Sequence, residues 1–171
     1  MEPFDRRLPL YSYLRPLIEG RRVLEVGAGS GRGAEHLVSL GASAVVSIEE
    51  GGSSRARARI AGVTFAPHAR AAEGQGPFDL VIVADGASFV RGQSGLDVAA
   101  AARLLAPEGF VVVAVENADR PQARGGVGYY ELQDALAAKL PNVRMFGQTP
   151  FAAIGIAEFD GGAGGLQIDS G

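Results

Sequence analysis

The sequence has no cysteine and no long apolar run, and each shortage limits what the protein can be. Without cysteine there are no disulfides, no thiolate nucleophiles and no sulfur-ligated metal sites. The apolar runs fall far short of the roughly 18 residues that a membrane span needs, and no apolar segment typical of a signal peptide follows Met1. The sequence therefore predicts a cytoplasmic protein without a membrane partner.

Positive charge does not predominate, because 16 Lys and Arg residues stand against 19 Asp and Glu residues. The formal net charge is −3, which leaves no overall electrostatic signature of nucleic-acid binding. Lys139 is the only lysine, so the basic residues are almost all arginine, and the chain is rich in alanine and glycine. This composition favours a bacterial protein from a GC-rich genome, and we expect no nucleic-acid partner.

The length suits one compact domain, because a chain of 171 residues can build a single hydrophobic core without disulfides or structural metals. We place this domain at residues 1–160. The glycine-rich residues 161–171 are predicted to form a flexible tail or linker. An apolar pattern starts again at Leu166, which favours a domain cut from a longer protein with further domains after residue 171.

Strand and helix patterns alternate along the chain, which is typical of a doubly wound α/β fold. Apolar runs predict strands at residues 22–26, 44–49, 63–66, 78–84 and 110–115, and helical spacing predicts helices at 34–40, 96–105 and 130–140. Two closing strands, 143–146 and 153–159, are expected to pair antiparallel. The predicted fold is a mostly parallel Rossmann-like sheet of about seven strands with an antiparallel last strand and helices on both faces.

The most informative segment runs from Val23 to Gly31, where a strand ends in a carboxylate and three alternating glycines. Glycine accepts positive φ and lets the backbone approach a ligand closely. The N-terminus of the next helix suits an anionic group. The G-x-G-x-x-G pattern of dinucleotide-binding turns is matched only in a relaxed form, and no P-loop Gly-Lys-Ser/Thr follows. A tight turn without a ligand stays an alternative.

A second carboxylate, Glu49, ends the next predicted strand. It lies at about the twenty-residue offset at which folds of this class place an acid for the ribose hydroxyls of a nucleotide. Glu50 is its neighbour and the less favoured candidate for this role.

The E-x-G-x-G-x-G pattern resembles the first motif of class I S-adenosylmethionine-dependent methyltransferases. Residues 78–81 and 104–110 also resemble the segments with which the fourth and fifth strands of that family begin. The resemblance therefore covers roughly residues 10–159. It implies S-adenosylmethionine as the cofactor. The cofactor-binding residues that it implies are Glu25, Gly27, Ala28, Gly29, Gly31, Glu49 and Asp85.

The resemblance says less about the methyl acceptor. Residues 84–87, after the fourth predicted strand, lack the Pro-Pro-aromatic motif of enzymes that methylate exocyclic or amide nitrogens, and the cysteine needed to methylate cytosine carbon is missing. A small molecule or a protein side chain remains as acceptor. Weak catalytic candidates are Asp85, His68 as a general base, and Glu116. Tyr11 and Tyr13 are candidates for covering the cofactor.

Two alternatives stay open. Oxygen atoms of Asp85, Glu116 and Asn117 could hold a divalent cation, although carboxylates exposed to solvent at strand ends, with no metal, are the favoured interpretation. The chain also lacks an acid directly after the third predicted strand and a lid over the acceptor. The second alternative is therefore a catalytically inactive methyltransferase-like domain that serves as a binding or localisation module.

Overall fold

The computed structural model describes residues 7–27, 29–48, 60–120, 123, 125–148 and 166–168. Seven strands are present in these residues: β1 (Arg22–Val26), β2 (Ala44–Ile48), β3 (Val63–Ala66), β4 (Phe78–Val83), β5 (Leu105–Val113), β6 (Phe146–Gln148) and β7 (Leu166–Ile168). The helices are α1 (Arg7–Tyr13), α2 (Arg15–Ile18), α3 (Arg32–Ser39), α4 (Ala69–Glu73), α5 (Ala87–Val90), α6 (Val98–Leu104) and α7 (Tyr129–Ala137).

The main sheet has five strands in the order β3-β2-β1-β4-β5, and every neighbouring pair is parallel. The chain builds outward from β1 to β3 and then crosses to β4 on the other side of β1. The strand order therefore reverses between β1 and β4, where open α/β sheets bind their ligands. The mostly parallel α/β fold predicted from the sequence is confirmed.

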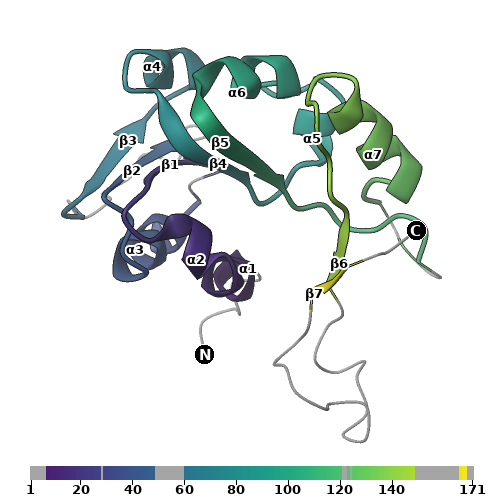
Figure 1. Ribbon diagram of the computed structural model, residues 1–171, viewed down its shortest axis with the longest axis horizontal. Coiled ribbons are helices and arrows are strands. Elements are labelled where there is room, and N and C mark those ends of the chain that lie inside the picture. The colour runs from purple at the N-terminus through teal and green to yellow at the C-terminus, as the bar shows by residue number, and fades with distance from the viewer. Residues whose placement is uncertain are drawn as a thin grey trace, which may run out of the picture.

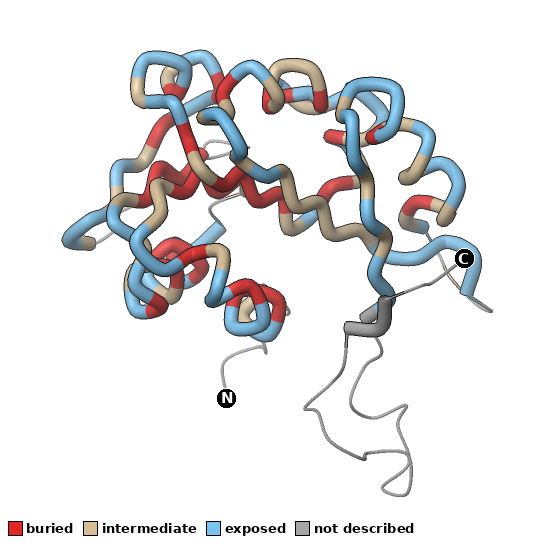
Figure 2. Tube along the Cα trace, in the orientation of Figure 1, coloured by how far each residue is buried: buried red, intermediate tan, exposed pale blue. Residues whose placement is uncertain are grey.

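Helices cover both faces of this sheet (Figure 1). On one face α1, α2 and α3 pack over Val23, Leu80 and Ile82. On the other face α4, α5, α6 and α7 pack over a cluster that includes Leu24 and Val81. Neighbouring residues of one strand thus enter different cores, which explains why these strands are apolar throughout. Figure 2 shows the buried residues concentrated in the central strands, with β5 only partly buried.

The end of the chain departs from the prediction. Among the described residues β6 pairs antiparallel with β7 in a separate two-stranded sheet and does not join the main sheet. The expected strand at residues 143–146 lies two to three residues later, at Phe146–Gln148, and its expected partner at 153–159 lies outside the described residues. The main sheet is thus described with five strands, so an antiparallel last strand in it stays a prediction. Three residues of the predicted tail form β7.

Strand β5 also differs, because it begins at Leu105 rather than at 110. The start of β5 is irregular, because its pairing with β4 jumps from Leu105 to Phe110. The short helices α1, α2, α4 and α5 have too few residues to show a periodic pattern and were not expected. None of the described helices is long and apolar enough to cross a membrane.

Candidate functional site

The glycine turn lies at the carboxyl end of β1, as the sequence predicts. Gly27, Gly29 and Gly31 have φ angles of +92°, +51° and +86°, in the left-handed region that favours glycine. Gly31 caps the N-terminus of α3. A Cβ atom placed on Gly27 would meet no atom of the described residues within 4 Å, so these residues leave space beside the first glycine of the turn. Ala28 lies outside the described residues.

Glu25 is fully buried directly before this turn. Its Oε1 accepts a hydrogen bond from the Tyr11 hydroxyl at 2.8 Å, and its Oε2 accepts one from the Ser47 hydroxyl. Tyr11 is itself buried, so it supports the carboxylate instead of covering a cofactor. In this structure the Glu25 carboxylate is therefore a buried hydrogen-bond acceptor next to the turn. Its predicted contact with a cofactor stays a prediction.

Gly33 leaves the space that this buried carboxylate needs. It lies in the first turn of α3, and a Cβ atom there would come within 2.1 Å of Glu25 Oε1 and 3.1 Å of the Tyr11 ring. The helix can therefore pass over Glu25 only with glycine at this position.

Arg7, the first residue of α1, places its guanidinium on the glycine turn. Its Nη1 donates a hydrogen bond of 2.7 Å to the Gly27 carbonyl and lies 3.9 Å from Glu25 Oε1. A Cβ atom on Gly29 would lie 3.3 Å from Arg7 Nη2. A charged side chain from outside the predicted motif thus belongs to this site.

Strand register brings the carboxyl ends of β2 and β4 to the same edge as the glycine turn. Val26 of β1 pairs with Ile48 of β2 on one side and with Val83 of β4 on the other. Glu49 follows Ile48 but lies outside the described residues. Asp85 lies two residues after Val83 and is exposed. Asp85 therefore lies just beyond the end of the strand next to the turn, at the point where the strand order reverses.

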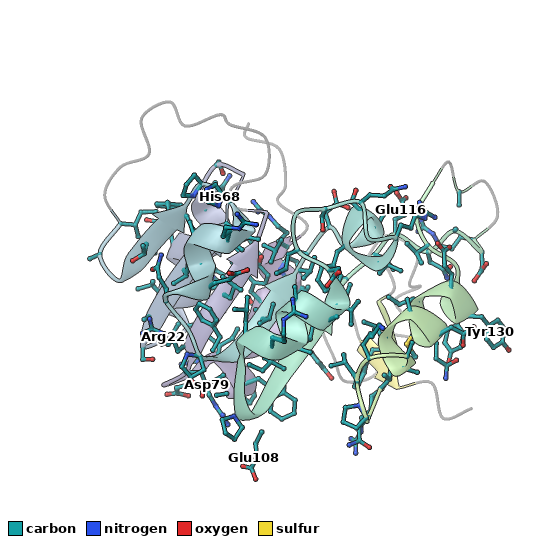
Figure 3. The ribbon with its side chains drawn as sticks, turned by 90° about the horizontal axis from the view of Figure 1, so that it is seen from above. Arg22, His68, Asp79, Glu108, Glu116 and Tyr130 are labelled. Atoms are coloured by element: carbon teal, nitrogen blue, oxygen red, sulfur yellow. The ribbon has the colours of Figure 1, made fainter. Side chains whose placement is uncertain are left out.

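His68 and Glu116 lie towards this carboxyl edge, whereas Arg22, Asp79 and Glu108 lie towards the opposite edge (Figure 3). His68 caps the N-terminus of α4, where its Nδ1 accepts a hydrogen bond of 3.1 Å from the Ala71 amide. A neutral imidazole that accepts at Nδ1 carries its proton on Nε2. This capping bond therefore occupies the lone pair that a general base would use.

Glu116 and Asn117 take part in local contacts. Glu116 pairs with Arg120 at 3.1 Å, and Asn117 Oδ1 accepts a hydrogen bond of 2.8 Å from the Asp119 amide. Within the residues that the structure describes, no group of three or more His, Cys, Asp or Glu side chains could hold a metal ion. Asparagine is not among these residue types, so the alternative cation site at Asp85, Glu116 and Asn117 stays a prediction.

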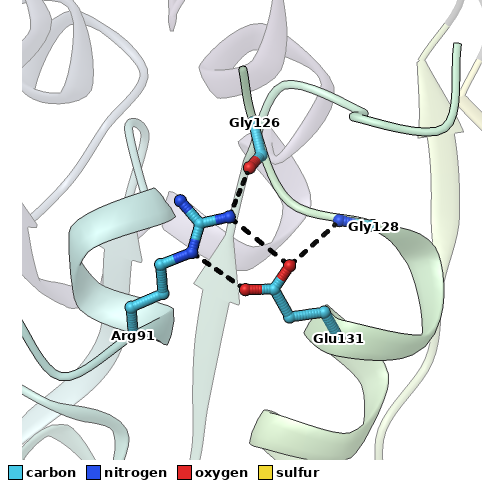
Figure 4. Close-up of polar contacts among 4 residues, drawn as sticks. All are labelled: Arg91, Gly126, Gly128 and Glu131. Carbon is cyan, nitrogen blue, oxygen red and sulfur yellow. Dashed lines mark hydrogen bonds and ion pairs between the residues drawn. The ribbon is translucent and has the colours of Figure 1, made fainter.

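An ion pair joins the segments beyond β4 and β5 (Figure 4). Arg91, after α5, donates to the Glu131 carboxylate at 2.9 Å and to the Gly126 carbonyl at 2.7 Å. The hydrogen bond from Arg91 lowers the pKa of Glu131 below its ordinary value, and the same bond raises the pKa of Arg91. Glu131 also accepts a long hydrogen bond from the Gly128 amide. The pair thus fastens α7 to α5.

Sequence reasoning missed several residues of this site. Ser47 is the only polar residue inside the apolar run of β2, and this pattern could have indicated a buried partner for an acid. Gly33 continues the series of glycines at every second position, after Gly27, Gly29 and Gly31, and could have been included in the predicted motif. Arg7 carries no comparable signal, because nothing local connects it with a turn twenty residues later.

Comparison with known proteins gives a fold but no close relative. No protein-family model matches the sequence, and no curated protein matches it. Among solved structures, SMU.776, described as a methyltransferase and crystallised with S-adenosylhomocysteine, is similar with a TM-score of 0.64 at 12% identity. The match covers 87% of this chain and 44% of that one.

Two further structures agree. A protein from Streptococcus mutans, described as an S-adenosylmethionine-dependent methyltransferase, has a TM-score of 0.63 at 12% identity, over 87% of this chain and 44% of that one. A ribosomal protein L11 methylase from Lactobacillus delbrueckii subsp. bulgaricus has a TM-score of 0.59 at 20% identity, over 84% and 74%. The chain spans less than half the length of the first two. This protein has the fold of class I S-adenosylmethionine-dependent methyltransferases.

Proposed function

We propose that this chain binds S-adenosylmethionine at the glycine turn and is the cofactor-binding domain of a methyltransferase. The observation that carries the proposal is the buried Glu25 beneath a left-handed glycine turn, at the point where the strand order reverses. A solved structure of the same fold was crystallised with S-adenosylhomocysteine.

The described residues fit such a cofactor. Open space beside Gly27 lets a ligand approach the backbone, and the turn leads directly into the N-terminus of α3. The Gly27 carbonyl and the Glu25 carboxylate already face a cationic group, the Arg7 guanidinium. β2 ends at Ile48, which pairs with Val26 directly before the turn. We propose that Glu49, the next residue in the sequence, binds the ribose hydroxyls.

The cofactor supplies an already activated methyl group when it is bound, so the protein mainly has to position the acceptor and exclude water. Asp85 lies two residues after the end of the neighbouring strand and is exposed, so we propose that it contacts the cofactor or the acceptor. We propose a small molecule or a protein side chain as the acceptor. The fold shared with a ribosomal protein L11 methylase supports the protein class. A cytoplasmic and bacterial setting is part of the same proposal.

A second candidate function is a catalytically inactive module that retains the fold. The contacts of the catalytic candidates favour it. His68 caps a helix, Glu116 pairs with Arg120, and Asn117 binds a backbone amide. Side chains committed to local structure are poorly placed to act on an acceptor.

Calorimetric titration with S-adenosylmethionine and S-adenosylhomocysteine tests the proposal. We expect dissociation constants on the order of micromolar for the wild type. Glu49→Ala should weaken both about 10-fold or more, because charged hydrogen bonds to ribose are lost. Glu50→Ala is the matched control and should bind like the wild type.

Absence of binding to folded wild-type protein would overturn the cofactor proposal. Equal losses in Glu49→Ala and Glu50→Ala would overturn the role of Glu49. If binding is present, production of S-adenosylhomocysteine with candidate acceptors separates the enzyme from the inactive module.

A further inference from the structure

A pocket of about 320 Å³ lies between the start of α4 and the connection from α5 to α6. It is lined by His68, Ala69, Arg70 and Gly95, and His68 lies towards the carboxyl edge of the sheet (Figure 3). A Cβ atom on Gly95 would meet nothing within 4 Å, so the pocket is open on that side. Its volume is at the lower end of the range for small-molecule sites.

His68 contributes a hydrogen-bond donor to this pocket. Its Nδ1 accepts a hydrogen bond of 3.1 Å from the Ala71 amide, so the imidazole is neutral and carries its proton on Nε2. Within the part of the chain that the structure describes, Nε2 makes no hydrogen bond. The side chain therefore has one N–H group left for a ligand.

Arg70 contributes a positive charge. It is exposed, and among the described residues it forms no ion pair or side-chain hydrogen bond, not even with Glu73 one turn along α4. Asp97, two residues after Gly95, accepts a hydrogen bond of 2.7 Å from the Ala100 amide and caps α6. The polar side chains that line the pocket are thus donors only.

Strand register sets the separation between the pocket and the glycine turn. Ala66 of β3 pairs with Ile48 of β2, and Ile48 pairs with Val26 directly before the turn. Neighbouring strands lie about 4.8 Å apart, so these ends of β3 and β1 are roughly 10 Å apart. His68 follows Ala66 by two residues. The pocket therefore lies within the length of a small molecule from the proposed cofactor site.

A guanidinium and an imidazole N–H suit the oxygen atoms of a carboxylate or a phosphate. The adenosine part of S-adenosylmethionine carries no negative charge, so this pocket requires a different ligand. We propose that His68 and Arg70 bind the carboxylate or phosphate group of a small molecule other than the cofactor. That this molecule is the methyl acceptor rests on the proposed function, whereas anion binding at the pocket does not.

Titration with inorganic phosphate and with glutarate, at constant ionic strength and without cofactor, tests the pocket. Nitrogen-15 NMR of the His68 and Arg70 side chains should show saturable shifts with at least one of these probes, and the tighter probe identifies the anion. Arg70→Gln should weaken binding about 10-fold or more, because the charge is lost. Arg15→Gln, at an exposed arginine of α2, is the matched control and should bind like the wild type.

His68→Asn separates ligand binding from helix capping. The asparagine oxygen can accept the Ala71 hydrogen bond and cap α4, but the imidazole N–H is lost. This variant should weaken anion binding about 3- to 10-fold and unfold at the same temperature as the wild type.

Repeating the phosphate titration with saturating S-adenosylhomocysteine tests whether the two ligands are distinct. We expect both to bind together. Competition would overturn the inference, because the cofactor would then occupy the pocket. Absence of saturable shifts, or unchanged binding in Arg70→Gln, would overturn it as well. Titration of the wild type with S-adenosylhomocysteine alone tests the proposed function separately, so the two failures are distinguishable.

Discussion

At the residue scale, Gly33 links the glycine turn to the carboxylate beneath it. Glycine inside a helix is usually unfavourable, because alanine is about 1 kcal/mol better there. Here a Cβ atom would overlap Glu25 Oε1 at 2.1 Å. Close approach therefore outweighs helix propensity at this position.

Gly33→Ala should lower the free energy of unfolding by about 1 to 3 kcal/mol, because Glu25 or α3 must shift to relieve the overlap. Urea denaturation measures the change. Gly74→Ala is the control, since a Cβ atom at Gly74 meets nothing within 4 Å and the residue has a φ of −78°. Unchanged stability in Gly33→Ala would contradict the close contact.

At the element scale, α7 is joined to α5 by the pair of Arg91 and Glu131 (Figure 4). Both side chains are well exposed, so solvent and salt screen their attraction. The pair sets the position of the helix more than it adds to stability.

The pair predicts a defined pH dependence. The pKa of Glu131 is lower in the folded protein than its ordinary value of 4.5, so its contribution to stability is present above pH 4.5. The contribution is lost as the pH falls through the folded-state pKa. NMR titration of the Glu131 side chain should show the lowered pKa in the wild type and a rise towards 4.5 in Arg91→Gln.

Arg103→Gln is the control for this titration, because Arg103 lies in α6 outside the pair. A Glu131 pKa that stays low without Arg91 would show that the guanidinium is not its cause. The effect should also shrink at high salt.

Elements differ in how well the sequence predicts them. β1 and β3 were predicted at their observed bounds and β2 at its observed start, because each is an apolar run. β5 begins five residues earlier than expected, since its irregular start at residues 106–109 reads as a turn. Its pairing with β4, and not its local pattern, makes that segment part of the strand.

At the scale of the whole molecule, one central sheet separates two cores. β1 and β4 have parallel neighbours on both sides and are almost wholly buried, whereas β3 lies at an edge and is only partly buried. Stability should therefore be highest at the centre of the sheet.

Native-state hydrogen exchange tests this gradient. The amides of β1 and β4 should exchange only through global unfolding, and those of β3 should exchange faster through local opening. Increasing denaturant should bring the two rates together. Protection of β3 equal to that of β1 would show that the sheet opens only as a unit.

The sequence by itself determined the β1 strand, the glycine turn and the parallel α/β class. Each depends on neighbours a few residues apart: an apolar run, residues with left-handed φ, and a helix start. Only the tertiary structure decided what surrounds the turn. Arg7, Tyr11 and Ser47 lie 14 to 22 residues from their partners in the chain. Packing of α1 and β2 against β1 brings them together, and no local pattern records that packing.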